Sequence, residues 1–164
     1  MMQWSDVVPE NRKEKKPALE TDPRFPSGEW KGFWLQRGFP GRQWMALSLE
    51  FRAGNVTGEG RDLVGDFLLQ GTYLLDTGKC GMIKTYVGLY SLIYDGANEN
   101  DGKWIWGVWH LPGESGGFHI WPKGEADPTL SRLSEAKELP AEEHGQNKLV
   151  PVEATAGNFP RNQR

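Results

Sequence analysis

Apolar and polar residues alternate along much of the chain between residues 28 and 122, with the two-residue period of half-buried β-strands. The run from Gln43 to Phe51 is the clearest case, because Met45 and Leu47 begin an apolar face that every second residue continues. Similar segments are predicted at 29–36, 56–62, 66–75, 103–111 and 118–122. Glycine, asparagine and aspartate separate them, as in tight turns. The pattern therefore predicts about eight short strands joined by hairpins.

A tyrosine-rich stretch from Met82 to Tyr94 is predicted to be one continuous strand at the centre of the sheet. Tyr86, Tyr90 and Tyr94 recur every fourth residue, a spacing that suits either a helix or a strand. The many β-branched residues and the glycine at position 88 favour the strand. Both faces of this strand are largely apolar, so the pattern leaves open which face points inward.

Consecutive hairpins favour an antiparallel up-and-down meander, because sequential strands usually lie side by side. The first and last segments, around Trp30 and Phe118, are apolar on more than one face. Exposed apolar edges invite aggregation, so we expect the two ends to pair and close a small all-β barrel over residues 27–122. Residues 1–26 are expected to form a disordered tail. Residues 123–164 are expected to form a second tail, in which leucine spacing allows a short helix over 128–139.

Composition narrows the function classes. The net charge of −3 gives no basic field for nucleic acid or an anionic membrane. Cys80 is the one cysteine, so an internal disulfide and a cysteine-based zinc site are excluded. No apolar run approaches the roughly 20 residues needed to span a bilayer, and no secretory signal begins the chain. We expect a soluble, cytoplasmic protein without cofactor or metal, although a mature secreted form stays open.

An eight-stranded barrel is wide enough either for packed side chains or for one small ligand, and the sequence leaves both open. If the even face of the central stretch points inward, Lys84 needs a carboxylate partner, and Asp62 and Asp66 are the nearest candidates. Such a pair would anchor a ligand whose apolar part contacts aromatic rings. The predicted ligand-binding residues are Trp34, Asp62, Asp66, Lys84, Tyr86, Tyr90, Trp104, Trp106 and His110.

The same residues have simpler explanations. Asp62 and Asp66 could provide acid–base chemistry or bind a cation, but turn capping is the commoner role of aspartate. His110 and His119 lack the spacing of zinc ligands. Trp44 and Trp109 are predicted to face outward, where aromatic rings can stack on sugars or a partner protein.

Gly28-Glu29-Trp30 opens the first strand, and Gly71-Thr72-Tyr73 lies in a later hairpin. These features, with about eight strands between Gly28 and Pro122, resemble calycin-type barrels, the lipocalin- and avidin-like folds. The resemblance implies a barrel able to hold a ligand. The polar residues with which avidins hold biotin have no match by position, so it does not imply biotin binding. A fold does not fix a function.

Three functions follow from these observations. The leading hypothesis is a non-catalytic barrel that binds a small, partly apolar molecule at its open end, with no catalytic residue assigned. The second is a structural or protein-interaction module with a filled core. The third is an enzyme that uses Asp62 or Asp66 with Lys84.

Overall fold

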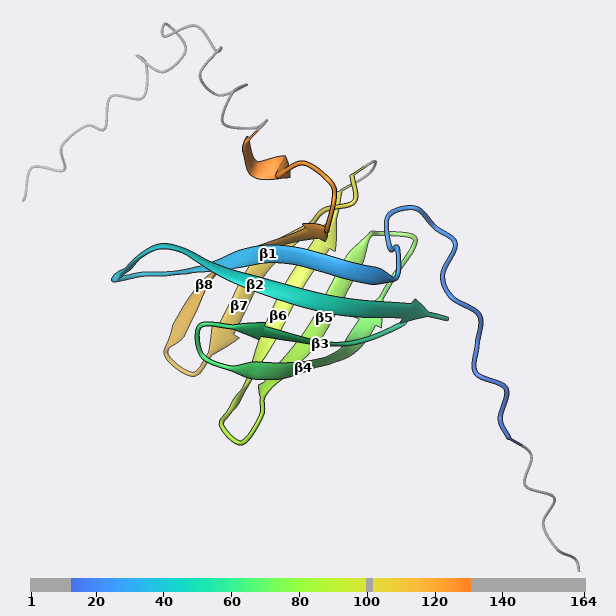
Figure 1. Ribbon diagram of the computed structural model, residues 1–164, viewed down its shortest axis with the longest axis horizontal. Helices are drawn as coiled ribbons and strands as arrows, with labels where there is room; N and C mark the ends of the chain where they lie inside the picture. Colours follow the sequence, from blue (N-terminus) through green and yellow to red (C-terminus); the bar gives the residue numbers. More distant parts are fainter. Residues whose placement is uncertain (1–12, 100–101, 131–164) are drawn as a thin grey trace, which may run out of the picture. The chain divides into compact units, whose positions relative to one another are not determined.

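A computed structural model describes residues 13–99 and 102–130. The described residues form eight strands: β1 (Gly28–Gln36), β2 (Phe39–Arg52), β3 (Asn55–Asp62), β4 (Asp66–Tyr73), β5 (Lys79–Tyr86), β6 (Ser91–Asn98), β7 (Ile105–Leu111) and β8 (Glu114–Pro122). Each strand pairs antiparallel with the next, and β1 pairs with β8 to close a barrel (Figure 1). The predicted all-β, closed up-and-down architecture is confirmed.

The central stretch is a hairpin, so its prediction as a single strand over 82–94 is wrong. β5 ends at Tyr86, β6 begins at Ser91, and Thr85 pairs with Ser91 across the turn. Gly88 has φ of 74°, a left-handed conformation that glycine adopts without steric cost. Apolar residues on both sides of Gly88 continue the strand-like pattern, so hydrophobic periodicity could not reveal this turn. The four-residue connection preserves parity, so even-numbered residues of both strands share one face.

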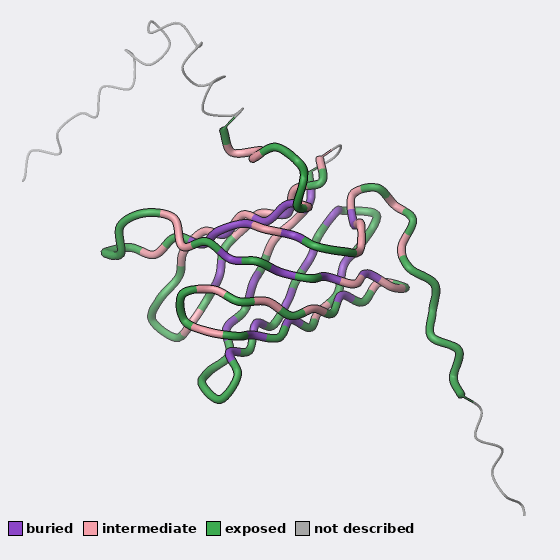
Figure 2. Tube along the Cα trace, viewed as in Figure 1, coloured by how far each residue is buried: buried purple, intermediate pink, exposed green. Residues whose placement is uncertain are grey.

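The even face of this hairpin points into the barrel, which answers the question that the sequence left open. Met82, Lys84 and Tyr94 are buried, whereas Ile83 and Ile93 are 53% and 54% exposed. Figure 2 shows this alternation of buried and exposed positions along β5 and β6. The hairpin thus places a lysine among the apolar residues of the core.

Strand β7 has the opposite orientation from the one expected. Trp109 is 3% exposed and belongs to the core, so the prediction that it faces outward is wrong. Both faces of β7 carry tryptophan, and alternation alone could not choose between them. Gly116 on the neighbouring strand makes the inward orientation feasible, because a Cβ there would lie 2.7 Å from the indole Nε1 of Trp109.

A second aromatic layer covers the outside of β1, β2 and β8. Phe33 and Trp121 occupy outward positions, yet they are 3% and 1% exposed. Their rings pack at 6.0 Å and 76°, and Trp44 packs edge-on against Trp121. The guanidinium of Arg42 lies 4.4 Å from the Phe33 ring centroid. Apolar burial in this protein therefore extends beyond the barrel interior.

The N-terminal segment closes one end of the barrel. Phe25 is fully buried, with ring centroids 5.4 Å from Phe51 and 4.8 Å from Tyr73. The backbone N–H of Glu20 donates to the carbonyl of Phe51 at 2.9 Å. Residues 18–26 were expected to be part of a disordered tail, but they are ordered against the barrel. One buried phenylalanine in a polar segment anchors them, and composition does not reveal such an anchor.

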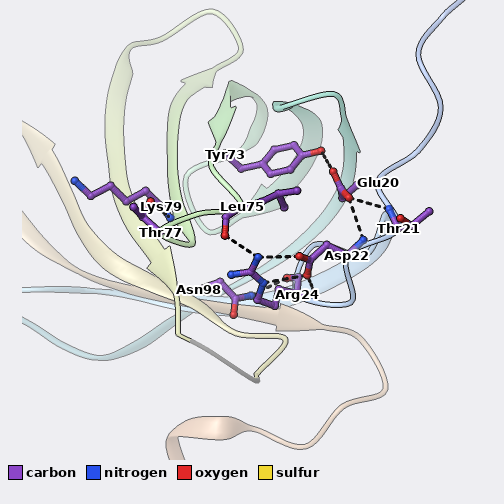
Figure 3. A network of polar contacts seen from close by, with 9 residues as sticks. All are labelled: Glu20, Thr21, Asp22, Arg24, Tyr73, Leu75, Thr77, Lys79 and Asn98. Carbon is purple, nitrogen blue, oxygen red and sulfur yellow. Dashed lines mark hydrogen bonds and ion pairs between the residues drawn. The ribbon is translucent and has the colours of Figure 1, made fainter.

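Polar contacts hold this N-terminal segment, residues 18–26, at the rim of the barrel, and we call the segment the plug (Figure 3). The Tyr73 hydroxyl donates to Glu20 at 2.7 Å, and Arg24 forms an ion pair with Asp22 at 2.7 Å. Arg24 also donates to the carbonyl of Leu75 at 2.8 Å, and its own carbonyl accepts from Asn98 at 2.7 Å. The plug is thus bonded to the end of β4, to the β4–β5 connection and to the end of β6.

Pro128, Thr129 and Leu130 form a helical turn in a unit separate from the barrel. The remainder of the helix predicted over 128–139 lies outside the described residues, as do residues 1–12 of the first predicted tail and 131–164 of the second.

Candidate functional site: an aromatic cavity at the open end

The hairpins β1–β2, β3–β4, β5–β6 and β7–β8 gather at the end of the barrel away from the Phe25 plug (Figure 1). A cavity of about 110 Å³ lies there. Its lining residues are Trp34, Gln36, Val64, Tyr86, Tyr90, Leu92, Tyr94, Trp109, Leu111 and Glu114. Tyr90 is 46% exposed, so the cavity opens to solvent at the mouth. The described barrel therefore has one plugged end and one open, aromatic end.

A buried ion pair lies behind the cavity lining. The Nζ of Lys84 is 2.5 Å from Oδ2 of Asp62, and neither side chain has any exposed surface. The Tyr86 hydroxyl donates to the same oxygen at 2.6 Å, and Nε1 of Trp34 donates to it at 3.1 Å. Three donors thus converge on one carboxylate oxygen. The predicted partnership of Lys84 with Asp62 is present, and it orients two rings of the cavity wall.

Aromatic rings surround the Lys84 ammonium group. Its Nζ lies 4.0 Å from the Phe67 ring centroid and 4.7 Å from that of Tyr86. It also donates to the Tyr94 hydroxyl at 3.2 Å. Gly60 allows this arrangement, since a Cβ there would come within 2.5 Å of the Phe67 ring. Ring faces and one carboxylate together replace the water that the ammonium loses on burial.

The protonation states follow from this environment. Burial lowers the pKa of Lys84 to about 8, although Asp62 opposes the shift. Burial acts to raise the pKa of Asp62, but hydrogen bonds from Lys84 and Tyr86 outweigh it and the pKa is lowered. Burial and the hydrogen bond to Asp62 raise the pKa of Tyr86 well above its usual range. At neutral pH the site therefore holds a charged pair and a neutral phenol.

Two tryptophans belong to the cavity lining. Trp109 donates through Nε1 to the carbonyl of Leu35 at 2.9 Å. Its ring meets Trp34 at 83° with centroids 6.4 Å apart. Each indole N–H has an acceptor, so both rings are fixed while their apolar surfaces remain available to the cavity.

The mouth carries the remaining polar groups. Nε2 of Gln36 donates to Oε2 of Glu114 at 3.3 Å, which joins β1 to the start of β8. Tyr90, in the β5–β6 connection, packs against Tyr86 at 65° with centroids 5.3 Å apart. A carboxylate and an exposed phenol ring therefore border the entrance.

The structure brings together some of the predicted site residues and separates others. Trp34, Tyr86 and Tyr90 line the cavity, and Asp62 and Lys84 lie behind it. The others lie away from it. Asp66 forms an exposed ion pair with Arg61 at 2.6 Å, Trp104 and Trp106 stack on His119, and His110 is exposed on the outward face of β7.

Sequence reasoning missed seven lining residues: Gln36, Val64, Leu92, Tyr94, Trp109, Leu111 and Glu114. Tyr94 was detectable, because it shares the even face of the central stretch with Lys84. Glu114 and Gln36 were detectable only from topology, since alternate hairpin turns of a meander meet at one end of a barrel. Trp109 required knowledge of the β7 orientation.

The described residues offer little for covalent or metal chemistry. No group of three or more histidine, cysteine, aspartate or glutamate side chains within them could hold a metal ion. Burial raises the pKa of the Cys80 thiol to about 12, so it stays protonated. No helix within the same part of the chain is long and apolar enough to cross a membrane.

Comparisons with known proteins leave the site's chemistry to be argued from its geometry. No protein-family model matches the chain, and no curated protein matches it.

Proposed function

We propose that this protein is a non-catalytic binding barrel that receives a small, partly apolar group in the cavity at its open end. The observation that carries the proposal is the contrast between the two ends. Phe25 is fully buried at one end, whereas aromatic rings at the other line about 110 Å³ of unfilled space. Mostly apolar walls with a few placed polar groups are typical of ligand sites.

The size of the cavity limits its occupant. Apolar cavities of about 150 Å³ hold benzene, so this smaller one suits a group of fewer atoms whose remainder projects into solvent. The closed eight-stranded meander also supports the likeness to calycin-type barrels, which carry ligands in this region of the fold.

The buried pair supports binding more than catalysis. Lys84 and Asp62 have no exposed side-chain surface, so neither meets a molecule in the cavity directly. Their role in this proposal is to hold Trp34 and Tyr86 in place. A rigid wall lowers the entropic cost of binding.

A titration with 3,3-dimethylbutan-1-ol, read by tryptophan fluorescence, tests the proposal. We expect saturable quenching in the wild type and its loss in Leu111→Phe, which enlarges a residue of the cavity wall. Leu68→Phe is the matched control, because Leu68 is 54% exposed and does not line the cavity. If the wild type shows no saturable response, or if Leu111→Phe responds as the wild type does, the proposal is wrong.

A second candidate function is protein interaction, and the outer face of β4 to β7 favours it. Leu68, Ile83, Ile93 and Val108 are each at least 41% exposed, and Ile83 pairs with Ile93 in register. Exposed apolar side chains grouped on one face are common at contacts between proteins. The pairing partner we would test is a second copy of the chain, by sedimentation equilibrium. Ile83→Lys would abolish a dimer formed through this face.

A further inference from the structure

We propose that the group received by the cavity is a small methylated ammonium, the positively charged head of a choline- or betaine-type compound. This inference rests on the proposed function and assigns a chemical class to the ligand. Its evidence is the aromatic lining, the charge at the mouth and the size of the space.

The cavity lining is an aromatic cage. Trp34 and Trp109 meet at 83°, and Tyr86 and Tyr90 meet at 65°, so the rings within each pair are steeply inclined to each other and all four line the cavity. Tyr94 adds a fifth ring to the same space. Aromatic faces carry negative electrostatic potential, and several faces around one space recognise quaternary ammonium groups.

Charge at the mouth has the sign that such a ligand needs. Glu114 is the one charged side chain among the described residues that line the cavity. Lys84, the cation closest to these rings, is neutralised by Asp62 at 2.5 Å and lies behind Tyr86 and Tyr94. An anionic ligand would meet Glu114 and the ring faces, and both would repel it.

The available space favours a methylated group over a bare ammonium. A trimethylammonium head, counted with the carbon that bears it, has about five non-hydrogen atoms, fewer than the benzene that fills a cavity of about 150 Å³. A bare ammonium is strongly hydrated and needs several hydrogen-bond acceptors when it leaves water. Part of the hydrogen-bonding capacity near the cavity is already used, since Gln36 donates to Glu114 and Tyr86 to Asp62. Methyl groups require no such partners and pack against rings.

Choline and 3,3-dimethylbutan-1-ol provide a direct test, because they have the same shape and differ in the positive charge. We expect choline to bind wild-type protein about tenfold more tightly or better, measured by calorimetry at one ionic strength. Equal or weaker binding of choline, with the neutral alcohol still bound, would overturn the inference and leave the binding barrel standing. Binding of neither compound would overturn both proposals.

Variants at the mouth separate charge from ring contact without disturbing the core. Glu114→Gln should weaken choline binding about threefold or more and leave the neutral alcohol unchanged. Glu59→Gln, an exposed carboxylate on the outside of β3, should change neither. Tyr90→Phe should keep choline affinity and Tyr90→Leu should reduce it, because only phenylalanine preserves the ring face. Unchanged choline affinity in both Glu114→Gln and Tyr90→Leu would contradict the inference.

Discussion

The two ends of the barrel are built from the same kinds of strand but reach burial in different ways. At the plugged end, Phe25 packs on Phe51 and Tyr73, and the ions Asp22 and Arg24 stay at the rim. At the open end, an ion pair goes inside and the space above it is left partly empty. The plugged end is closed by apolar packing with one buried amide, Asn98, at its rim, whereas the open end keeps an ion pair in the interior.

This difference indicates that the open end of the barrel serves a purpose other than stability. Replacing a buried ion pair by apolar residues is often neutral or stabilising, so the Lys84–Asp62 pair is weak evidence for a stability role. Its geometric consequence is specific, because Asp62 fixes the Tyr86 hydroxyl and the Trp34 indole. The comparison thus makes distinct predictions for the two ends.

The largest expected effect is at the buried pair. Asp62→Asn leaves the Lys84 charge buried without its carboxylate and should lower the free energy of unfolding by about 3–5 kcal/mol. Asp66→Asn, which removes an exposed and solvent-screened pair with Arg61, should have little effect on stability. Urea denaturation of both variants measures the difference. Adding Lys84→Met to Asp62→Asn should recover part of the loss, and equal costs for the two aspartates would refute the buried-pair account.

Removal of the plug should come next. Phe25→Ala deletes a fully buried ring and should destabilise the barrel by about 3 kcal/mol, at the low end for phenylalanine because the segment is terminal and can shift. Leu19→Ala, in the same segment but 46% exposed, should have little effect. Binding at the open end should persist in Phe25→Ala under folding conditions. Loss of binding would show that the two ends are not independent.

Tyrosine hydroxyls at the two ends should differ in a smaller way. Tyr73→Phe removes the hydrogen bond to Glu20 and should cost about 1 kcal/mol in thermal or urea unfolding. Tyr90→Phe should be close to neutral, since that residue is exposed at the mouth. Similar losses in the two variants would mean that the mouth is packed as firmly as the plug.

The smallest expected effect is on the pH dependence of stability. The pKa of Asp62 is lower in the folded than in the unfolded chain, so the unfolded state binds a proton first as the pH falls below about 4. Stability from this residue is present above that pH and is lost below it. Urea unfolding between pH 6 and 3 should therefore show a flatter curve for Asp62→Asn than for the wild type. If the two curves of unfolding free energy against pH had the same slope, groups other than Asp62 would be responsible for the acid sensitivity.

The sequence predicted the architecture better than it predicted the site. Alternation and turn residues sufficed for a meander, because each acts over a few neighbouring residues. The problem of two exposed apolar edges then predicted the pairing of β1 with β8. The prediction that even-numbered residues of the central stretch share one face stayed correct although the turn at Gly88 was missed, because the connection has an even number of residues. The Lys84–Asp62 partnership followed from the cost of burying an unpaired charge.

The missed parts depend on contacts between distant segments. Trp109 faces inward because Gly116 on β8 leaves room for its indole, and alternation along β7 carries no such information. Phe25 plugs the barrel from a segment whose composition is that of a tail. Glu114 and Gln36 meet only once alternate hairpins share an end.

Indole N–H resonances of the tryptophans provide the most direct test of the central claim, because these side chains mark both ends. Trp34 and Trp109 line the open cavity, whereas Trp30 donates to Pro26 beside the plug. Titration of ¹⁵N-labelled protein with choline should shift the Trp34 and Trp109 signals saturably and leave the Trp30 signal in place. Signals that do not saturate, or that move equally at both ends, would contradict a ligand site at the open end.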